Sequence, residues 1–264
     1  MAIQTGAIKY RGSFKSIRNY MNLHDPNTYA GEKGGANRDL IMNNPAFART
    51  RENMNEFKGC GIAVKAIRRG MLNLLPEQTD KLFTARLMAI VKEINHRDLA
   101  GIRGKRAIIF SDERIYLSTM VFNVLEDIAD LLGYQFLTEH PITRASAKLT
   151  LTGFNIKKNY VPKGATHYHV QDHVSIISNY TYNEANRRYE PMTLLNTMSG
   201  FVYSEYAPIG TLLTDELDVA FPVGTLPGDD DTVIQCVGVE FYQKTGDSTY
   251  LPLKGSSMKV ADVF

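Results

Sequence analysis

Tryptophan is absent from this sequence of 264 residues, and cysteine occurs only twice, as Cys60 and Cys236 in widely separated segments. A disulfide framework is therefore not expected, and a reducing cytoplasm is the simplest location. Without tryptophan, the 14 tyrosines and 12 phenylalanines must supply the large rings of the core. Hydrophobic residues make up 44% of the chain and charged residues 22%, a composition that excludes a disordered or fibrous protein.

Long apolar runs are also absent, and none approaches the roughly 20 residues that a membrane-spanning helix needs. Residues 1–6 have no basic start followed by an apolar stretch, which is the pattern of a signal peptide. We therefore expect no membrane span. The chain is expected in the cytoplasm, or released as part of a particle without a signal peptide.

A coherent set of catalytic residues is missing as well. The one histidine cluster consists of His167, His169 and His173. Alternation places His167 and His169 on one face of a strand, which suits two ligands of a transition metal, and His173 could join from the next strand. No clear fourth ligand accompanies them, and a polar sheet face explains the same residues.

Cys60 would act as a nucleophile only with a histidine base beside it. Its neighbours Gly59 and Gly61 indicate instead a small buried residue where another element approaches closely, or a helix break. We thus expect no enzyme, no cofactor, no bound metal and no small-molecule substrate. A metal-dependent enzyme around His167 and His169 is kept as a third alternative.

Charge is distributed unevenly along the chain, although the net charge is only +2. Residues 1–106 contain 19 Lys and Arg against 9 Asp and Glu, whereas residues 107–264 contain 11 against 19. We therefore divide the chain into a basic N-terminal region (β arm 1–43, helical pair 44–106) and an acidic domain (107–264). This asymmetry indicates a polyanionic partner or contact between unlike ends of neighbouring copies. Two domains that share charge unevenly are the simpler explanation.

The N-terminal arm is predicted to form a small sheet. Residues 6–14 and 17–20 alternate apolar and polar side chains, which predicts two short strands joined by a turn at Gly12 and Ser13. Residues 28–30 form a third candidate strand. A sheet of this size is marginal alone and must pack on its own chain or on a neighbour. The side chains expected to bind that partner are Ile8, Tyr10, Phe14, Ile17 and Tyr20.

Two antiparallel helices are predicted next. Asn44 can cap the first turn, Pro45 fits the first helical position, and an apolar stripe continues to residue 74. A second stripe predicts a helix at 77–95. Charged residues at the start of the first helix could form a fixed salt-bridge lattice, bind another subunit or face solvent; they are Arg49, Arg51, Glu52 and Glu56. A basic surface for phosphate or a neighbouring copy is expected from Lys65, Arg68, Arg69, Arg103, Lys105 and Arg106.

Short strands prevail beyond residue 106. Strands are predicted at 107–110 and 115–122, and a short amphipathic helix at 124–132. Further strands are predicted at 148–156, 166–170, 174–178, 217–221, 233–242 and 250–253, separated by turn residues. Such a pattern predicts a C-terminal immunoglobulin-like antiparallel β-sandwich. The expected fold class is therefore α+β, with a short β arm and an antiparallel helix pair before the sandwich.

Three segments carry a family resemblance. The first is AGEKGG at 30–35, followed by NPAFARTRENMNEF at 44–57; the second is GATHY at 164–168; the third is VEFYQ at 239–243, with YLPLK at 250–254. In order and spacing they resemble a family of uncharacterised proteins common in Bacteroidetes. The resemblance implies a shared fold and no known activity. Gly31 and Asn44 depart from the Arg and Asp that are more usual in that family.

Two function classes follow from these patterns. The first is a self-assembling structural subunit of a filament, tube or particle, which binds other copies of itself through head-to-tail contacts and the N-terminal strand arm. The second is a nucleic-acid-associated protein that uses the basic N-terminal region. No helix-turn-helix or zinc motif accompanies the basic residues.

Self-assembly through unlike charges should weaken as ionic strength rises, because exposed charges are screened over about 10 Å at 0.1 M salt. Sedimentation across a salt series measures this. Reversal of Arg68, Arg69, Lys105 and Arg106 to Glu should disrupt assembly, and changing Asp229–Asp231 to Lys could then restore it. A monomer at low salt that retains nucleic acid through purification would contradict self-assembly and favour the second class.

Overall fold

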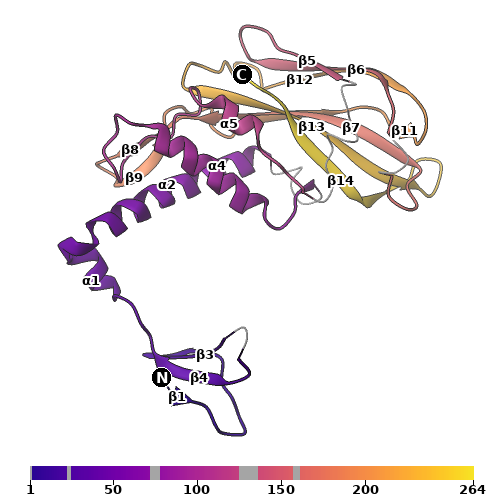
Figure 1. Ribbon diagram of the computed structural model, residues 1–264. Helices are drawn as coiled ribbons and strands as arrows, with labels where there is room; N and C mark the ends of the chain where they lie inside the picture. The colour runs from indigo at the N-terminus through magenta and orange to yellow at the C-terminus, as the bar shows by residue number, and fades with distance from the viewer. Residues whose placement is uncertain (1, 23–24, 72–77, 125–135, 157–160) are drawn as a thin grey trace. The chain divides into compact units, whose positions relative to one another are not determined.

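The computed structural model describes residues 2–22, 25–71, 78–124, 136–156 and 161–264 (Figure 1). Helix accounts for 22% and strand for 39%, and the sheets are antiparallel, so the prediction of a mixed α and β protein is confirmed. Backbone contacts divide the chain into an N-terminal unit, Met1–Arg51, and a main unit, Glu52–Phe264. This division follows contacts, whereas the predicted boundary after residue 106 follows charge.

The N-terminal unit contains a four-stranded sheet in the order β1-β4-β3-β2. Its strands are β1 (Ala2–Ile3), β2 (Gly12–Phe14), β3 (Ile17–Met21) and β4 (Thr28–Glu32). The strands predicted at 17–20 and 28–30 are confirmed. Of the residues predicted to form a strand at 6–14, only the last three are in a strand, β2. The turn lies at Lys15 and Ser16 rather than at Gly12, because Phe14 pairs with Ile17 and Lys15 takes the positive φ, 49°, that such a tight hairpin requires.

Side-chain oxygens cap the first two helical segments of the chain. Asn37 accepts a hydrogen bond from the Leu40 amide at the start of α1 (Arg38–Asn43). Asn44 accepts one from the Ala46 amide at the start of the 3-10 turn η1 (Pro45–Phe47), so the predicted cap is confirmed. Helix α2 (Ala48–Gly70) follows directly. The predicted end of this helix, at 72–74, lies outside the described residues.

Helix α4 (Phe83–Arg97) runs antiparallel to α2, as predicted. Glu56 pairs with Lys92, and further along α2 the Cys60 thiol lies 3.9 Å from the Val91 carbonyl. The helix starts later than predicted, because the Asp80 side chain accepts hydrogen bonds from the Leu82 amide and from Arg86.

Close packing explains the small residues in the middle of α2. A Cβ on Gly59 would lie 2.4 Å from the Tyr189 ring, and Cys60 is fully buried. The helix continues through Gly61 without a break. Of the two explanations for these residues, close approach of another element is therefore correct.

Two antiparallel sheets face each other in the main unit. The larger has the order β10-β7-β13-β14, with β11 also paired to β7, and the smaller has the order β12-β6-β5. Strands β8 and β9 form a separate hairpin. The bounds are β5 (Phe136–Glu139), β6 (Ser146–Phe154), β7 (His167–Ser178), β8 (Tyr180–Asn183), β9 (Arg188–Pro191), β10 (Ser199–Tyr203), β11 (Ala207–Pro208), β12 (Leu213–Ala220), β13 (Asp231–Lys244) and β14 (Tyr250–Val263).

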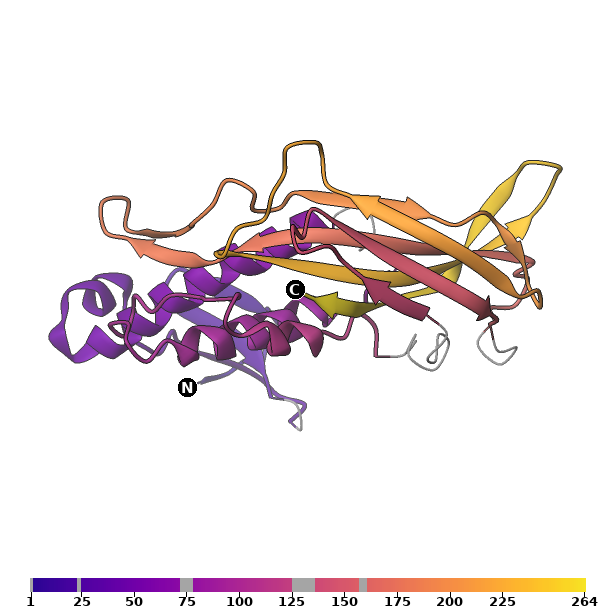
Figure 2. The same cartoon turned by 90° about the horizontal axis from the view of Figure 1, so that it is seen from above.

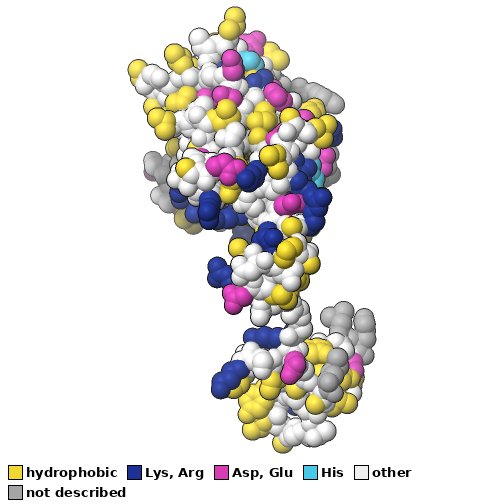
Figure 3. Space-filling view, turned by 90° about the vertical axis from the view of Figure 1, so that its left-hand side faces the viewer, with side chains coloured by type: hydrophobic (Ala, Val, Ile, Leu, Met, Phe, Trp, Pro, Cys, Tyr) yellow, Lys and Arg dark blue, Asp and Glu magenta, His cyan; other side chains and the backbone are white. Residues whose placement is uncertain are grey.

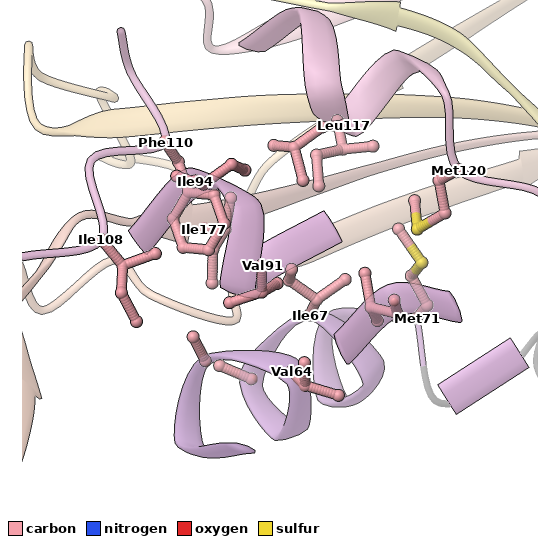
Figure 4. Close-up of a cluster of buried hydrophobic side chains, with 14 of the residues drawn as sticks. Val64, Ile67, Met71, Val91, Ile94, Ile108, Phe110, Leu117, Met120 and Ile177 are labelled. Carbon is pink, nitrogen blue, oxygen red and sulfur yellow. The ribbon is translucent and has the colours of Figure 1, made fainter. Parts of the chain in front are cut away.

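The larger sheet is the middle layer of three (Figures 1 and 2). On one face, Ile177 and Ile234 pack with residues of α2 and α4 such as Val64 and Val91 (Figure 4). On the opposite face, Val170 packs against Leu149 of the smaller sheet. Because both faces are covered, β7 is buried along nearly its whole length.

Several strand predictions need correction. The strands predicted at 166–170 and 174–178 are one continuous strand, β7, because the polar residues between them are buried and not in a turn. The strand predicted at 115–122 is wrong, since α5 (Arg114–Ser118) forms there and buries Leu117 while Ile115 stays exposed. Residues 107–110 contribute only an isolated bridge between Ile108 and Tyr180. Residues 125–132 of the helix predicted at 124–132 lie outside the described residues.

A buried carboxylate joins the two helices to the loop that follows them. Glu56 is fully buried, and its oxygens accept hydrogen bonds from the Gly104 amide (2.8 Å), from Arg106 (2.8 and 3.0 Å) and from Lys92 (2.6 Å). Burial alone would raise the pKa of the Glu56 carboxyl, but the hydrogen bonds outweigh it and lower that pKa to about 2. Glu56 is therefore charged and part of a fixed salt-bridge lattice.

Replacing Glu56 with Ala should destabilise the main unit by about 3–5 kcal/mol, because two cations lose a buried partner. Thermal or urea unfolding followed by circular dichroism measures the loss. Glu52→Ala is the matched control, since Glu52 is part-exposed and lies 3.5 Å from Arg103; it should cost less than about 1 kcal/mol. Equal losses in both variants would contradict the central role of Glu56.

Candidate functional site

The sheet of the N-terminal unit carries apolar side chains on both faces. Register places Phe14 beside Ile17, and alternation puts Met21 on the same face. On the opposite face, the rings of Tyr20 and Tyr29 stack with centroids 5.9 Å apart. The predicted partner-binding residues Phe14 and Ile17 thus share one face, whereas Tyr20 points to the other.

A groove lies on the Phe14 face. Gln4 holds the segment before β2, because its side-chain amide donates to Asn19 Oδ1 (2.8 Å) and its carbonyl oxygen accepts from the Tyr10 amide (2.9 Å). The resulting groove has a volume of about 470 Å³. It is lined by Tyr10, Arg11, Gly12, Ser13, Phe14, Ile17, Asn19 and Ala30. Three of the five apolar residues predicted to bind a partner line it.

This sheet has almost no core of its own. Within residues 2–22 and 25–51, only Thr28 is buried. Phe14 is 70% exposed and Ile17 45%, and Ile8 and Tyr10 are also exposed. A small sheet gains stability mainly by covering a hydrophobic face. The exposed groove therefore has the properties of a docking surface.

The charged residues predicted at the start of α2 serve different purposes. Arg51 donates hydrogen bonds to the carbonyls of Ile41 (2.7 Å) and Asn44 (2.9 Å), so it ties the end of α1 to α2. Glu52 lies beside Arg103, and Arg49 is exposed.

The predicted basic surface is only partly assembled. Arg106 is bound to buried Glu56, and Lys105 pairs with Glu184 at 2.5 Å. Arg103 pairs with Glu52 and also donates to Asn53. Arg106 thus contributes to the structure of the loop, whereas Arg103 and Lys105 form exposed surface pairs.

The remaining predicted cations lie along exposed positions of α2. Lys65, Arg68 and Arg69 are exposed. Lys58, about two turns before Lys65, is also exposed on the same side of the helix, and the sequence reasoning missed it. We call Lys58, Lys65, Arg68 and Arg69 the α2 cation face. No ion pair between described residues includes any of the four. Lysine and arginine side chains are dark blue in Figure 3.

Two residues of the proposed charge-reversal series are unsuited to it. Asp231 is buried, and its carboxylate accepts hydrogen bonds from Thr193 Oγ1 (2.5 Å) and the Gly228 amide (3.0 Å). Reversing Asp231 or Arg106 would therefore disturb folding. The cations suited to a test of surface charge are those of the α2 cation face.

The three histidines have separate partners. His169 Nε2 lies 2.9 Å from a carboxylate oxygen of Glu240, and the His169 ring stacks with two tyrosines. His173 Nε2 meets the Gly70 carbonyl at 2.9 Å, and His167 Nδ1 lies beside Thr166. His173 belongs to the same strand as the other two, not to the next one. Within the described residues, no group of three or more His, Cys, Asp and Glu could hold a metal ion.

A second buried carboxylate, Asp172, lies between the two sheets. Alternation places it between Val170 and Val174, which belong to hydrophobic clusters on the same face. The Gln235 amide donates to both carboxylate oxygens, at 3.1 and 2.9 Å. Burial outweighs these bonds and raises the pKa of Asp172 to about 7.

Comparison with known proteins adds no further constraint. No protein-family model, curated protein or solved structure matches the chain. None of the helices within the described residues has the length and hydrophobicity to cross a membrane. Function must therefore be argued from the exposed surfaces and the charges of the chain.

Asp172→Asn should raise the melting temperature at about pH 8 and flatten its dependence on pH. The folded state binds the Asp172 proton more tightly than the unfolded state, so stability falls as pH rises from about 4 to about 7. The new amide could also donate to Gln235 Oε1, which has no hydrogen-bond partner among the described residues. About 1 kcal/mol corresponds to roughly 2–4 °C. Asp247→Asn, at an exposed position, is the control, and a lower melting temperature for Asp172→Asn at this pH would contradict the assignment.

Proposed function

We propose that this chain is a non-enzymatic structural subunit that assembles with other copies of itself. The observation that carries the proposal is the N-terminal sheet, which exposes Phe14, Ile17 and a groove of about 470 Å³ while it buries no hydrophobic side chain among its described residues. A sheet of this kind is stabilised when a partner covers it. A second copy is the partner that is always present.

Hydrophobic burial alone does not account for stable assembly. Fully covering Tyr10, Phe14 and Ile17 would contribute about 1.5–3 kcal/mol for each side chain. Association costs an estimated 4–15 kcal/mol in lost translational and rotational freedom. Strand pairing and charge attraction must therefore contribute to the same contact.

Charge supports a contact between unlike surfaces. The N-terminal unit contains 8 Lys and Arg against 3 Asp and Glu, and the main unit contains 22 against 25. A basic unit that docks on the acidic unit of the next copy makes a head-to-tail contact. Such contacts produce rings when the rotation closes, and filaments or tubes when it does not.

A nucleic-acid partner is the second candidate function, and the α2 cation face favours it. Four exposed cations on one helix are the kind of surface that neutralises phosphates. Under this alternative, the pure protein stays monomeric, and changing Lys65, Arg68 and Arg69 to Glu abolishes retention of nucleic acid.

Three finer proposals accompany the first. The two facing antiparallel sheets are proposed to form an immunoglobulin-like sandwich, on the basis of their short strands and tight turns. Membership of the Bacteroidetes family is proposed from the segments at 30–57, 164–168 and 239–254. A cytoplasmic location, or release as part of a particle, is proposed from the two free, buried cysteines.

Changing Phe14 and Ile17 together to Asp should raise the protein concentration needed for assembly at least tenfold, which corresponds to about 1.4 kcal/mol. Deletion of residues 1–22 should act in the same direction. Negative-stain microscopy and mass photometry measure assembly, and the melting temperature of the main unit should not change. Leu99→Asp with Ile102→Asp, at exposed positions of the main unit, is the control. If the Phe14 and Ile17 variant assembles like the unaltered protein, the arm is not the connector.

A further inference from the structure

The smaller sheet of the main unit ends in an open, acidic strand. Strand β12 is the outer strand of β12-β6-β5 and, among the described strands, pairs only with β6. It carries Asp215, Glu216 and Asp218. Near its end, Gly200 of β10 lies against the Ala220 carbonyl, so the open stretch precedes Ala220. Unpaired strand edges are templates for pairing with another chain.

Exposed apolar side chains flank this strand on both sides. Leu212 is 70% exposed just before β12, and Val223 is fully exposed shortly after it, followed by exposed Leu226. Glu216 already pairs with Lys148 at 2.6 Å. No ion pair between described residues includes Asp215 or Asp218. We call β12 with Leu212, Val223 and Leu226 the β12 edge.

The N-terminal unit presents the complementary features. Strand β2 is the outer strand of its sheet and pairs only with β3 among the described strands. Exposed Arg11 and Lys15 flank it, and Arg18 lies opposite Ser13 on β3. The apolar groove opens beside the same strand. A basic edge with an apolar groove thus matches an acidic edge with protruding aliphatic side chains.

We propose that β2 of one copy pairs with the β12 edge of a second copy, and that the groove receives an aliphatic side chain flanking β12. This inference rests on the proposed function and names the surface that the arm binds. Main-chain hydrogen bonds between the two edges add to hydrophobic burial in the groove. Opposite charges on paired strands contribute about 0.2–1 kcal/mol for each pair.

The test uses two variants that fail for different reasons. The arm variant is Phe14→Asp with Ile17→Asp, and the edge variant is Leu212→Asp with Asp218→Lys. Each should remain monomeric alone, at concentrations at least tenfold above those at which the unaltered protein assembles. The control, Ile142→Asp with Asp247→Lys, makes the same chemical changes at exposed positions elsewhere and should assemble normally. Circular dichroism shows whether the main unit is folded in all three.

Mixing the two variants distinguishes the possible contacts. The arm variant retains an intact β12 edge and the edge variant retains an intact arm, so together they should form one-to-one dimers that grow no further. Mass photometry detects these dimers. Because an Asp-substituted sheet could fail to fold, a second arm variant, Arg11→Glu with Lys15→Glu, is mixed with the edge variant in parallel and should give the same dimers.

The outcomes separate this inference from the function on which it rests. If the edge variant assembles normally while the arm variant does not, the arm binds another surface; self-assembly stands and the β12 edge is wrong. If neither mixture forms dimers although the edge variant and both arm variants are folded, the proposed contact is also wrong. If the unaltered protein is monomeric at all salt concentrations, the arm covers its own chain or another partner, and both proposals fail.

Discussion

Strand β7 pairs with β13 along its full length, from His167 to Ser178, and the other layers of the main unit attach to this pair. A strand pair covered on both faces needs a hydrophobic layer on each side. The helix pair α2 and α4 supplies one layer and the smaller sheet supplies the other. Edge strands β10, β11 and β14 then complete the larger sheet.

Two buried carboxyl groups in the interior of the main unit, Glu56 and Asp172, have pKa values that shift in opposite directions. Glu56 is fully buried yet ionised, because Lys92, Arg106 and the Gly104 amide surround its oxygens. Asp172 is also buried, but its donors, the Gln235 amide and the backbone at His173, carry no full positive charge, so burial dominates and its pKa is raised. Burial acts to raise the pKa of both carboxyls, and the outcomes differ because two cations offset it at Glu56 whereas no cation does so at Asp172. The ion pair with Glu56 also explains why Arg106 is unavailable to a partner.

The sheet of the N-terminal unit, unlike the larger sheet of the main unit, has exposed faces. Its strands alternate apolar and polar residues like the strands of the main unit, but neither face of the sheet is covered within the described residues of that unit. Alternation of apolar and polar residues in the sequence indicates only that a strand face is suited to burial. It does not indicate which surface covers that face. That is why Ile8, Tyr10, Phe14, Ile17 and Tyr20 could be selected from sequence, while their division between two faces and the groove could not. The turn at Lys15 and Ser16 determines that division.

Local sequence was sufficient for the cap at Asn44, the α4 stripe, the small residues at 59–61 and most strands, because these depend on neighbours within one or two turns. The predicted α2 stripe is right only in its second half, where Val64 and Ile67 are buried, and wrong at Met54 and Phe57, which are more than half exposed. The same information could not separate helix from strand at 115–118, since the apolar run there is too short to show a period. It also could not join 166–170 to 174–178, or recognise that Arg106 and Asp231 are satisfied inside the protein. Those outcomes depend on partners distant in sequence: Glu56 lies 50 positions from Arg106, and Thr193 lies 38 positions from Asp231. Only the tertiary structure brings such groups together, and it therefore decided which charges and strand edges remain exposed for a partner.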